Sequence, residues 1–166
     1  MNKKIEINRN NIFLTFNWKS KKLYEKLFYP ILKEFGLSQN EADVLLFLFN
    51  NKPLDTAKDI VEYRAISKSL ISKSVDLLIK KGYLSSEVDK VDRRSVHLKI
   101  KPTAIPIVEK LHEIQKDYFT LLLRNVTDEE YDVFETVLSK IYRNITDELD
   151  KGNSFNTSNT YSAIIN

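Results

Sequence analysis

The stretch from Thr56 to Lys101 constrains the fold of this 166-residue chain more than any other part of it. Its pattern is that of a short helix, a turn, a second helix and two strands separated by a charged loop. Thr56 is expected to cap the first helix, with Asp59 three residues further on. Gly82 supplies the left-handed conformation at which helices often end. The sequence therefore predicts a helix-turn-helix followed by a β-hairpin.

The second helix of the pair is expected to begin at Ser67, to end at Lys81 and to have two contrasting faces. One face is mostly apolar and contains Leu70, Ile71, Ser74, Val75, Leu77 and Leu78. The other face is polar and contains Lys68, Ser69, Ser72, Lys73, Asp76 and Lys80. Basic and hydroxyl side chains bind phosphates and base edges, although a solvated helix face has a similar composition. The polar face is the first candidate contact surface for DNA.

The stretches Tyr83–Val88 and Val96–Lys101 alternate apolar and polar residues, which predicts an antiparallel strand pair. The loop between them, DKVDRRS, has Arg93 and Arg94 side by side. Arginine is suited to a narrow minor groove, where the potential of DNA is most negative. A surface ion pair between Arg94 and Asp92 is the alternative, and it would contribute only about 0–1 kcal/mol. The helix pair and the hairpin together have the pattern of a winged helix-turn-helix, a DNA-reading module.

The distribution of charge also favours the stretch from Thr56 to Lys101 as the part that contacts DNA. Residues 52–102 carry 12 basic and 7 acidic side chains, whereas residues 103–166 carry 6 basic and 11 acidic ones. A surface that binds a polyanion requires such a local basic excess. The net charge of the whole chain, +3, is too small to indicate a partner by itself.

The segments before this stretch show helical periodicity. Residues from Ile12 to Phe35 have apolar side chains at helical spacing, and Pro30 is expected to kink that helix or divide it near Tyr29. Ser38 and Glu41 have the spacing of a capping box. The continuous apolar run 44–49 is expected to lie in the core.

Two further helices are predicted after the hairpin. The first runs from Pro102 to Asn125, with Pro106 tolerated in its first turn. Thr127 and Glu130 form a second capping box, and the last helix is expected to end near Asp150. Its apolar stripe suits a seam between helices and contains Tyr131, Phe134, Leu138, Ile141, Ile145 and Leu149. Residues 151–166 are rich in Asn and Ser and are expected to form a flexible tail.

This order of elements resembles the MarR family of bacterial transcription regulators. Three segments carry the resemblance: GLSQNEADVLLFL, ISKSLISKSVDLLIKKGYL and VDRRSVHLKI. The last contains the wing signature of the family, Asp-x-Arg, at Asp92 and Arg94. The residues that follow depart from the family, because Lys101 stands where a threonine is usual and the later glycine is missing. In a dimer of the family type, each protomer carries one winged helix-turn-helix. We therefore expect this junction to alter the spacing between the two winged modules.

The resemblance implies a mainly α fold with a small β-wing, in which long helices form a dimerisation platform. Residues 1–37 and 103–150 would form the platform, and residues 38–102 would form the winged helix-turn-helix. The implied partners are a second copy of the chain, double-stranded DNA with a palindromic operator, and a small aromatic or anionic effector, with repression as the implied activity. The expected DNA-binding residues are Arg64, Ser67, Lys68, Ser69, Ser72, Lys73, Lys90, Asp92, Arg93 and Arg94.

Other functional classes are disfavoured. The chain has no cysteine, which excludes disulfides and thiolate metal sites. There is no apolar run of the roughly 20 residues that a membrane span needs, and no signal-peptide core, so a cytoplasmic location is expected. A Gly-rich phosphate loop and a nucleophile–base signature are also missing, so neither an enzyme nor a cofactor is expected. His97 and His112 have no partner at metal-ligand spacing and are interpreted as structural or surface residues.

Two alternative functions stay open at this point. One is a winged-helix module that binds protein and not DNA, although the polar helix face lacks the exposed apolar anchor typical of such surfaces. The other is a carrier that binds a ligand among the aromatic residues of the first helix. Those residues are Phe13, Phe16, Trp18, Tyr24, Phe28 and Tyr29. An intertwined dimer needs large apolar side chains in any case, so we interpret them as packing residues.

Overall fold

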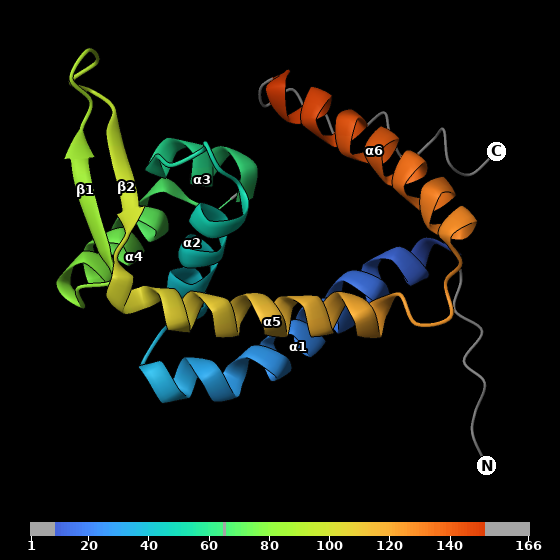
Figure 1. The fold of residues 1–166 in the computed structure, drawn as a ribbon. Coiled ribbons are helices and arrows are strands. Elements are labelled where there is room, and N and C mark those ends of the chain that lie inside the picture. Colours follow the sequence, from blue (N-terminus) through green and yellow to red (C-terminus); the bar gives the residue numbers. More distant parts are fainter. Residues whose placement is uncertain (1–8, 65, 152–166) are drawn as a thin grey trace. The chain divides into compact units, whose positions relative to one another are not determined.

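The computed structural model describes residues 9–64 and 66–151 (Figure 1), and all of the predicted tail at 151–166 except Lys151 lies outside these ranges. The chain divides into two compact units after Leu122, and each is described separately below. The first unit contains, in chain order, α1 (Arg9–Phe35), α2 (Gln39–Asn50), α3 (Ala57–Arg64), α4 (Lys68–Lys80), β1 (Leu84–Val88), β2 (Val96–Ile100), a 3-10 turn (Pro102–Ala104) and α5 (Ile105–Leu122). The second unit contains α6 (Asp128–Asp150). The predicted fold class, mainly α with a small β-wing, is confirmed.

Helix α2 is the centre of the first unit. Its residues Val44 to Leu48 are all buried, so the predicted core run is confirmed. They pack against α4 on one side and against α5 and the end of α1 on the others, and α1 and α5 lie side by side (Figure 1). A helix that is apolar on every side is stable only when other elements surround it. The helix pair α3–α4 is therefore built directly onto the core.

Side-chain caps fix where several helices begin, as the sequence predicts. The Ser38 N–H donates to the Glu41 carboxylate (2.8 Å), and the Glu41 N–H donates to the Ser38 hydroxyl (3.3 Å). Thr56 and Asp59 exchange the same pair of bonds at the start of α3, at 2.9 and 3.2 Å. Each pair satisfies two backbone N–H groups that the helix itself leaves free.

Of the two outcomes expected at Pro30, a kink or a division near Tyr29, the division is wrong, because α1 continues through Pro30 to Phe35. The Pro30 ring lies on the exposed side of the helix, while its neighbours Phe28 and Ile31 are buried in the core. Proline removes one hydrogen bond from the helix. The burial of these two nearby apolar side chains holds the turn in place.

The junction after the hairpin is compact. Pro102–Ala104 forms a 3-10 turn, and Pro106 lies in the first turn of α5, as predicted. The Thr103 hydroxyl donates to the Gly82 carbonyl (2.8 Å), so the junction is bonded to the turn that follows α4. Helix α5 ends at Leu122, earlier than the predicted Asn125, which has a left-handed φ of 65°.

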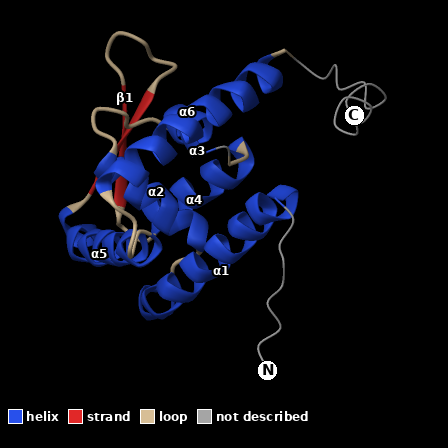
Figure 2. Ribbon diagram, turned by 90° about the vertical axis from the view of Figure 1, so that its right-hand side faces the viewer, coloured by secondary structure: helices blue, strands red, loops and turns tan. Residues whose placement is uncertain are grey.

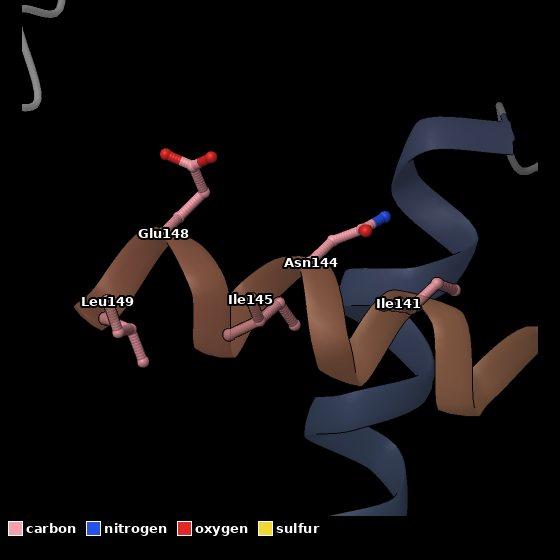
Figure 3. Close-up of a pocket in the computed structure, with 5 residues that line it drawn as sticks. All are labelled: Ile141, Asn144, Ile145, Glu148 and Leu149. Atoms are coloured by element: carbon pink, nitrogen blue, oxygen red, sulfur yellow. The ribbon is translucent and has the colours of Figure 1, made fainter. Parts of the chain in front are cut away.

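The second unit consists mainly of α6, which begins at the predicted capping box of Thr127 and Glu130. Five of the six side chains of its predicted apolar stripe are exposed, and the sixth, Ile141, is half-buried. An open pocket on this helix is lined by Ile141, Asn144, Ile145, Glu148 and Leu149 (Figure 3). The stripe is therefore an apolar face that its own unit leaves uncovered.

Within the described ranges, every helix is too short or too polar to cross a membrane.

Candidate nucleic-acid interface

Helix α4 presents a polar surface at its beginning. Ser67 caps the helix, since its hydroxyl accepts from the Leu70 N–H at 3.4 Å. The residues of the predicted polar face are all exposed: Lys68, Ser69, Ser72, Lys73, Asp76 and Lys80. The helix ends before Gly82, whose φ of +75° confirms the predicted left-handed stop.

The predicted apolar face of α4 is too wide. Ile71, Ser74, Val75 and Leu78 are buried, but Leu70 and Leu77 are exposed by 46% and 36%. Both leucines lie at the same edge of the apolar arc, so the core covers the rest of the arc and leaves this edge exposed. Leu70 consequently adds an exposed apolar group beside Ser69 and Lys73.

Strands β1 and β2 form an antiparallel hairpin that extends away from the helices of the first unit, with its loop at the far end (Figures 1 and 2). Leu84 pairs with Ile100 at the base, and Val88 pairs with Val96 next to the loop. Three basic side chains, Lys90, Arg93 and Arg94, are exposed in the loop. Val91 is 96% exposed and therefore does not anchor it. The loop is a basic tip on a narrow two-stranded support.

Carboxylates hold the loop through its backbone. Asp89 Oδ1 accepts from the N–H groups of both Val91 and Asp92, at 2.7 Å each. These two bonds, and then the bond from His97, lower the pKa of Asp89. The Asp92 carboxylate accepts from the Arg94 N–H at 3.1 Å. In the described part of the chain the Arg94 guanidinium takes part in no ion pair, so the alternative of a surface ion pair between Arg94 and Asp92 is not observed.

His97 joins the hairpin to the turn between α2 and α3, a role that the sequence did not indicate. Its Nδ1 lies 2.6 Å from Asp55 Oδ1, and its Nε2 lies 3.2 Å from Asp89 Oδ2. The hydrogen bond to Asp55, followed by that to Asp89, raises the pKa of His97. The backbones also meet here, since the Leu98 N–H donates to the Asp55 carbonyl at 2.8 Å.

A second cluster missed by sequence reasoning fixes the other end of α4. The Lys81 ammonium lies 2.6 Å from Glu41 Oε1 and 2.7 Å from the Gly36 carbonyl. Glu41 is only 2% exposed and also belongs to the capping box of α2. Burial would raise the pKa of Glu41, but the bonds from Lys81 and Ser38 outweigh it and lower that pKa. This ion pair, in which the carboxylate is buried and the lysine is partly exposed, connects the end of α4 to the beginning of α2, and the bond to Gly36 extends it to the end of α1.

Arg64 is the last residue of α3 and is half-buried. Its guanidinium lies over the Phe47 ring, 6.0 Å from the ring centre. It is thus packed on α2, whereas the other nine expected DNA-binding residues are exposed. In the two described ranges, no group of three or more acidic or histidine side chains is arranged to hold a metal ion.

This arrangement of elements also occurs in known proteins. Residues 35–95 match the sequence model of the MarR family. A MarR-family transcriptional regulator from Silicibacter pomeroyi is 20% identical with a TM-score of 0.72, over 87% of this chain and 97% of that one. A MarR protein from Peptoclostridium difficile is 22% identical with a TM-score of 0.73, over 91% and 97%.

BpsR of Bordetella bronchiseptica, whose DNA binding is regulated by 6-hydroxynicotinic acid, is 17% identical with a TM-score of 0.61, over 77% and 96% of the two chains. The first two likenesses extend over most of the chain on both sides of the matched segment. The segment 35–95 thus matches the MarR-family model, and the chain as a whole has the fold of the solved MarR-family regulators.

Proposed function

We propose that this chain is a homodimeric, sequence-specific DNA-binding regulator of transcription that acts as a repressor. The observation that carries the proposal is the pairing, in one compact unit, of an exposed basic and hydroxyl-rich face on α4 with an exposed basic wing loop. The MarR-family match at residues 35–95 covers both surfaces. Two contacts with one duplex are therefore proposed for each protomer.

Helix α4 is proposed to enter the major groove with its first two turns. Ser69, Ser72 and Lys73 are exposed there, and side chains of these types bond base edges and phosphates. Ser67 caps the helix and lies next to the same surface. The exposed Leu70 suits contact with a thymine methyl group, which is the apolar feature of the major groove. An exposed leucine is also a feature of protein-docking helices, so the alternative of a protein-interaction module is decided by experiment.

The wing is proposed to reach the flanking minor groove through Arg94. Its guanidinium is exposed and outside the ion pairs of the described residues, so no internal salt bridge has to break when it binds. Lys90 and Arg93 are proposed to bind the adjacent phosphates. Arg64 is proposed to contact the DNA backbone only from the edge of this surface, because its guanidinium packs over Phe47.

Dimerisation is supported by exposed apolar residues in each of the two units. In α1 the exposed side chains include Ile12, Phe13, Leu14, Phe16 and Trp18. In α6, Ile145 and Leu149 point to the same side of the helix, away from Glu148 (Figure 3). Soluble monomers rarely expose contiguous apolar patches of this kind. Residues 1–37 and 103–150 are therefore proposed as the dimerisation platform.

Replacing Leu138 by Glu should weaken dimerisation by about 100-fold or more, because an unpaired carboxylate in an apolar interface costs about 3 kcal/mol or more. Sedimentation velocity over a range of protein concentrations measures the change. Lys140→Glu is the matched control, since Lys140 is an exposed residue of α6 outside the apolar stripe. An unchanged dimer in L138E, with α6 still helical by circular dichroism, would exclude the stripe from the interface.

DNA binding is tested directly with a gel shift on the DNA upstream of the gene, followed by selection of sites from a random duplex library. Two-fold symmetry predicts a palindromic site whose half-sites are centred about 10 base pairs apart. A shift that survives competitor DNA supports a sequence-specific regulator. A clean dimer that shifts no duplex at low salt would favour the protein-interaction module.

Replacing Lys73 by Ala should reduce the steepness with which affinity falls as salt rises. Each phosphate contact contributes about 0.9 to the slope of log affinity against log salt, so a dimer that loses two should lose about 1.8. Fluorescence anisotropy at several salt concentrations measures the slope. Lys80→Ala is the matched control at the far end of α4. A slope unchanged in K73A would assign Lys73 to base contact or to solvent.

An effector is proposed as the signal that releases the DNA. The regulation of BpsR by 6-hydroxynicotinic acid, a small anionic aromatic, is the precedent among proteins of this fold. We propose an effector of the same chemical class, small and either aromatic or anionic, for this chain. Loss of the gel shift on addition of such compounds, with the dimer intact, tests this point.

A further inference from the structure

The ion-pair cluster of Asp55, His97 and Asp89 lies outside both proposed DNA contacts. Asp55 belongs to the turn between α2 and α3, His97 to β2, and Asp89 to the beginning of the wing loop. The imidazole ring lies between the two carboxylates, with Nδ1 2.6 Å from Asp55 and Nε2 3.2 Å from Asp89. One side chain therefore connects the body of the winged helix to the loop at the tip of the hairpin.

The contact with Asp89 continues into the backbone of the loop. Asp89 uses Oδ2 for His97 and Oδ1 for the N–H groups of Val91 and Asp92. The carboxylate of Asp92 in turn accepts from the N–H of Arg94. A series of hydrogen bonds therefore runs from Asp55 through the imidazole to the backbone that carries the wing arginine.

This arrangement requires a protonated imidazole. Both ring nitrogens face carboxylate oxygens, and only the imidazolium form donates from both. In the neutral ring, one nitrogen lone pair would face a carboxylate and repel it. The other charged groups nearby are Glu87, which pairs with His97 across the hairpin, and Lys99, which is ion-paired with Glu87. Those two charges offset one another, so Asp55 and Asp89 dominate the electrostatic environment of the ring.

We propose that His97 is a positioning residue for the wing, and that its protonation holds the loop in the form that presents Arg94 to DNA. The wing is then ordered at mildly acid pH and released at alkaline pH, and DNA affinity changes in the same direction. The link to affinity depends on the proposed function, whereas the link to wing order does not.

The direction of the pH effect follows from the raised pKa of His97. The stabilisation is complete below its ordinary pKa of about 6.5 and is lost as pH rises through the higher pKa of the folded state.

Wing order is tested by NMR on the full-length protein without DNA. Between about pH 5.5 and 8.5, the protection factors of the Val91 and Asp92 amides should fall as the His97 ring titrates. In His97→Gln, the same amides should show low protection that does not change with pH. His112→Phe is the matched control: it removes the other imidazole and keeps an aromatic ring beside Phe49, against which His112 packs. Protection that is independent of pH in the wild type, or unchanged in H97Q, would overturn the proposal.

DNA affinity is tested by anisotropy with a selected duplex at constant ionic strength. From about pH 6 to pH 8.5 the wild-type Kd should rise by about 10-fold or more, as expected when a groove contact is lost. Both H97Q and Arg94→Ala should show a much flatter profile, because His97 acts only through the wing, while H112F should follow the wild type.

An R94A profile as steep as that of the wild type would mean that the pH effect does not pass through Arg94, and would overturn the proposal. If no duplex binds but the amides still respond to pH through His97, the proposed function fails and the positioning role stands.

Discussion

Replacing Arg94 by Ala is expected to weaken operator binding by about 1–3 kcal/mol for each wing, and therefore by about 2–6 kcal/mol for a dimer. Even the lower value corresponds to a rise in Kd of about 30-fold. The effect should be large because Arg94 is exposed, is outside the ion pairs of the described residues, and extends from a loop whose backbone is already held by Asp89 and Asp92. Little of the binding energy is then needed to order the loop. Anisotropy titration with a selected operator measures the change.

Two further substitutions separate the roles of the basic residues. Arg94→Lys keeps the charge but not the weakly hydrated planar group that suits a narrow minor groove, so it should restore only part of the affinity. Arg143→Ala removes the same group from α6 and should leave binding unchanged. If R94A binds as tightly as R143A, Arg94 is not in the groove.

Replacing Lys81 by Met should lower the free energy of unfolding by about 3–5 kcal/mol at neutral pH, because the buried Glu41 carboxylate loses its counter-ion. That is a large part of the roughly 5–15 kcal/mol that stabilises a typical native protein. Urea unfolding at one fixed protein concentration measures the loss, since the stability of the proposed dimer would depend on concentration. Lys80→Met is the matched control, an exposed lysine one position earlier. Equal stability of the two variants would contradict the role of the ion pair.

The contribution of Glu41 to the pH dependence of stability should have opposite signs in K81M and in the wild type. The bonds from Lys81 and Ser38 lower the pKa of Glu41, so in the wild type this residue contributes stability above its unfolded pKa and loses it as pH falls. In K81M, burial, the largest single influence on the pKa of this carboxyl, is opposed only by the bonds from Ser38, so that pKa should rise and stability should increase as the carboxyl protonates. The double variant E41Q/K81M removes the uncompensated charge and should recover part of the loss. The amide oxygen of the introduced glutamine can still accept the hydrogen bond from the Ser38 N–H that belongs to the capping box.

Features that depend on neighbours in sequence were predictable. The capping boxes at Ser38 and Thr127 require only residues three positions apart. The buried run of α2 is equally local, because an apolar side chain at every position leaves no solvent-facing side. The left-handed φ of Gly82 follows from the missing Cβ, which lets glycine take that conformation without strain.

Features that depend on tertiary contacts were not predictable. Glu41 and Lys81 are 40 positions apart, and Asp55 and His97 are 42 apart. Neither pair has a local signature in the sequence. The packing of α2 on α4 brings the first pair together, and the packing of β2 on the turn between α2 and α3 brings the second pair together. The exposure of Leu70 shows the same limit, since periodicity gives the direction of a side chain but not the width of the surface that covers it. The polar face and the wing loop were predicted as a candidate site, whereas the residues that hold them in place were not.

The Lys81 ammonium links the ends of three helices. Glu41 lies in the first turn of α2, Gly36 directly follows α1, and Lys81 directly follows α4, so a single charged group joins three helix ends. Any displacement of the end of α1 must either carry α4 with it or break the bond from the Lys81 ammonium to the Gly36 carbonyl. A signal that bends the end of α1 would thus reach α4 through this polar contact as well as through the apolar core that Phe28 and Ile31 share with α2. In the proposed dimer, the spacing of the two α4 helices on a duplex would then depend on one lysine in each protomer.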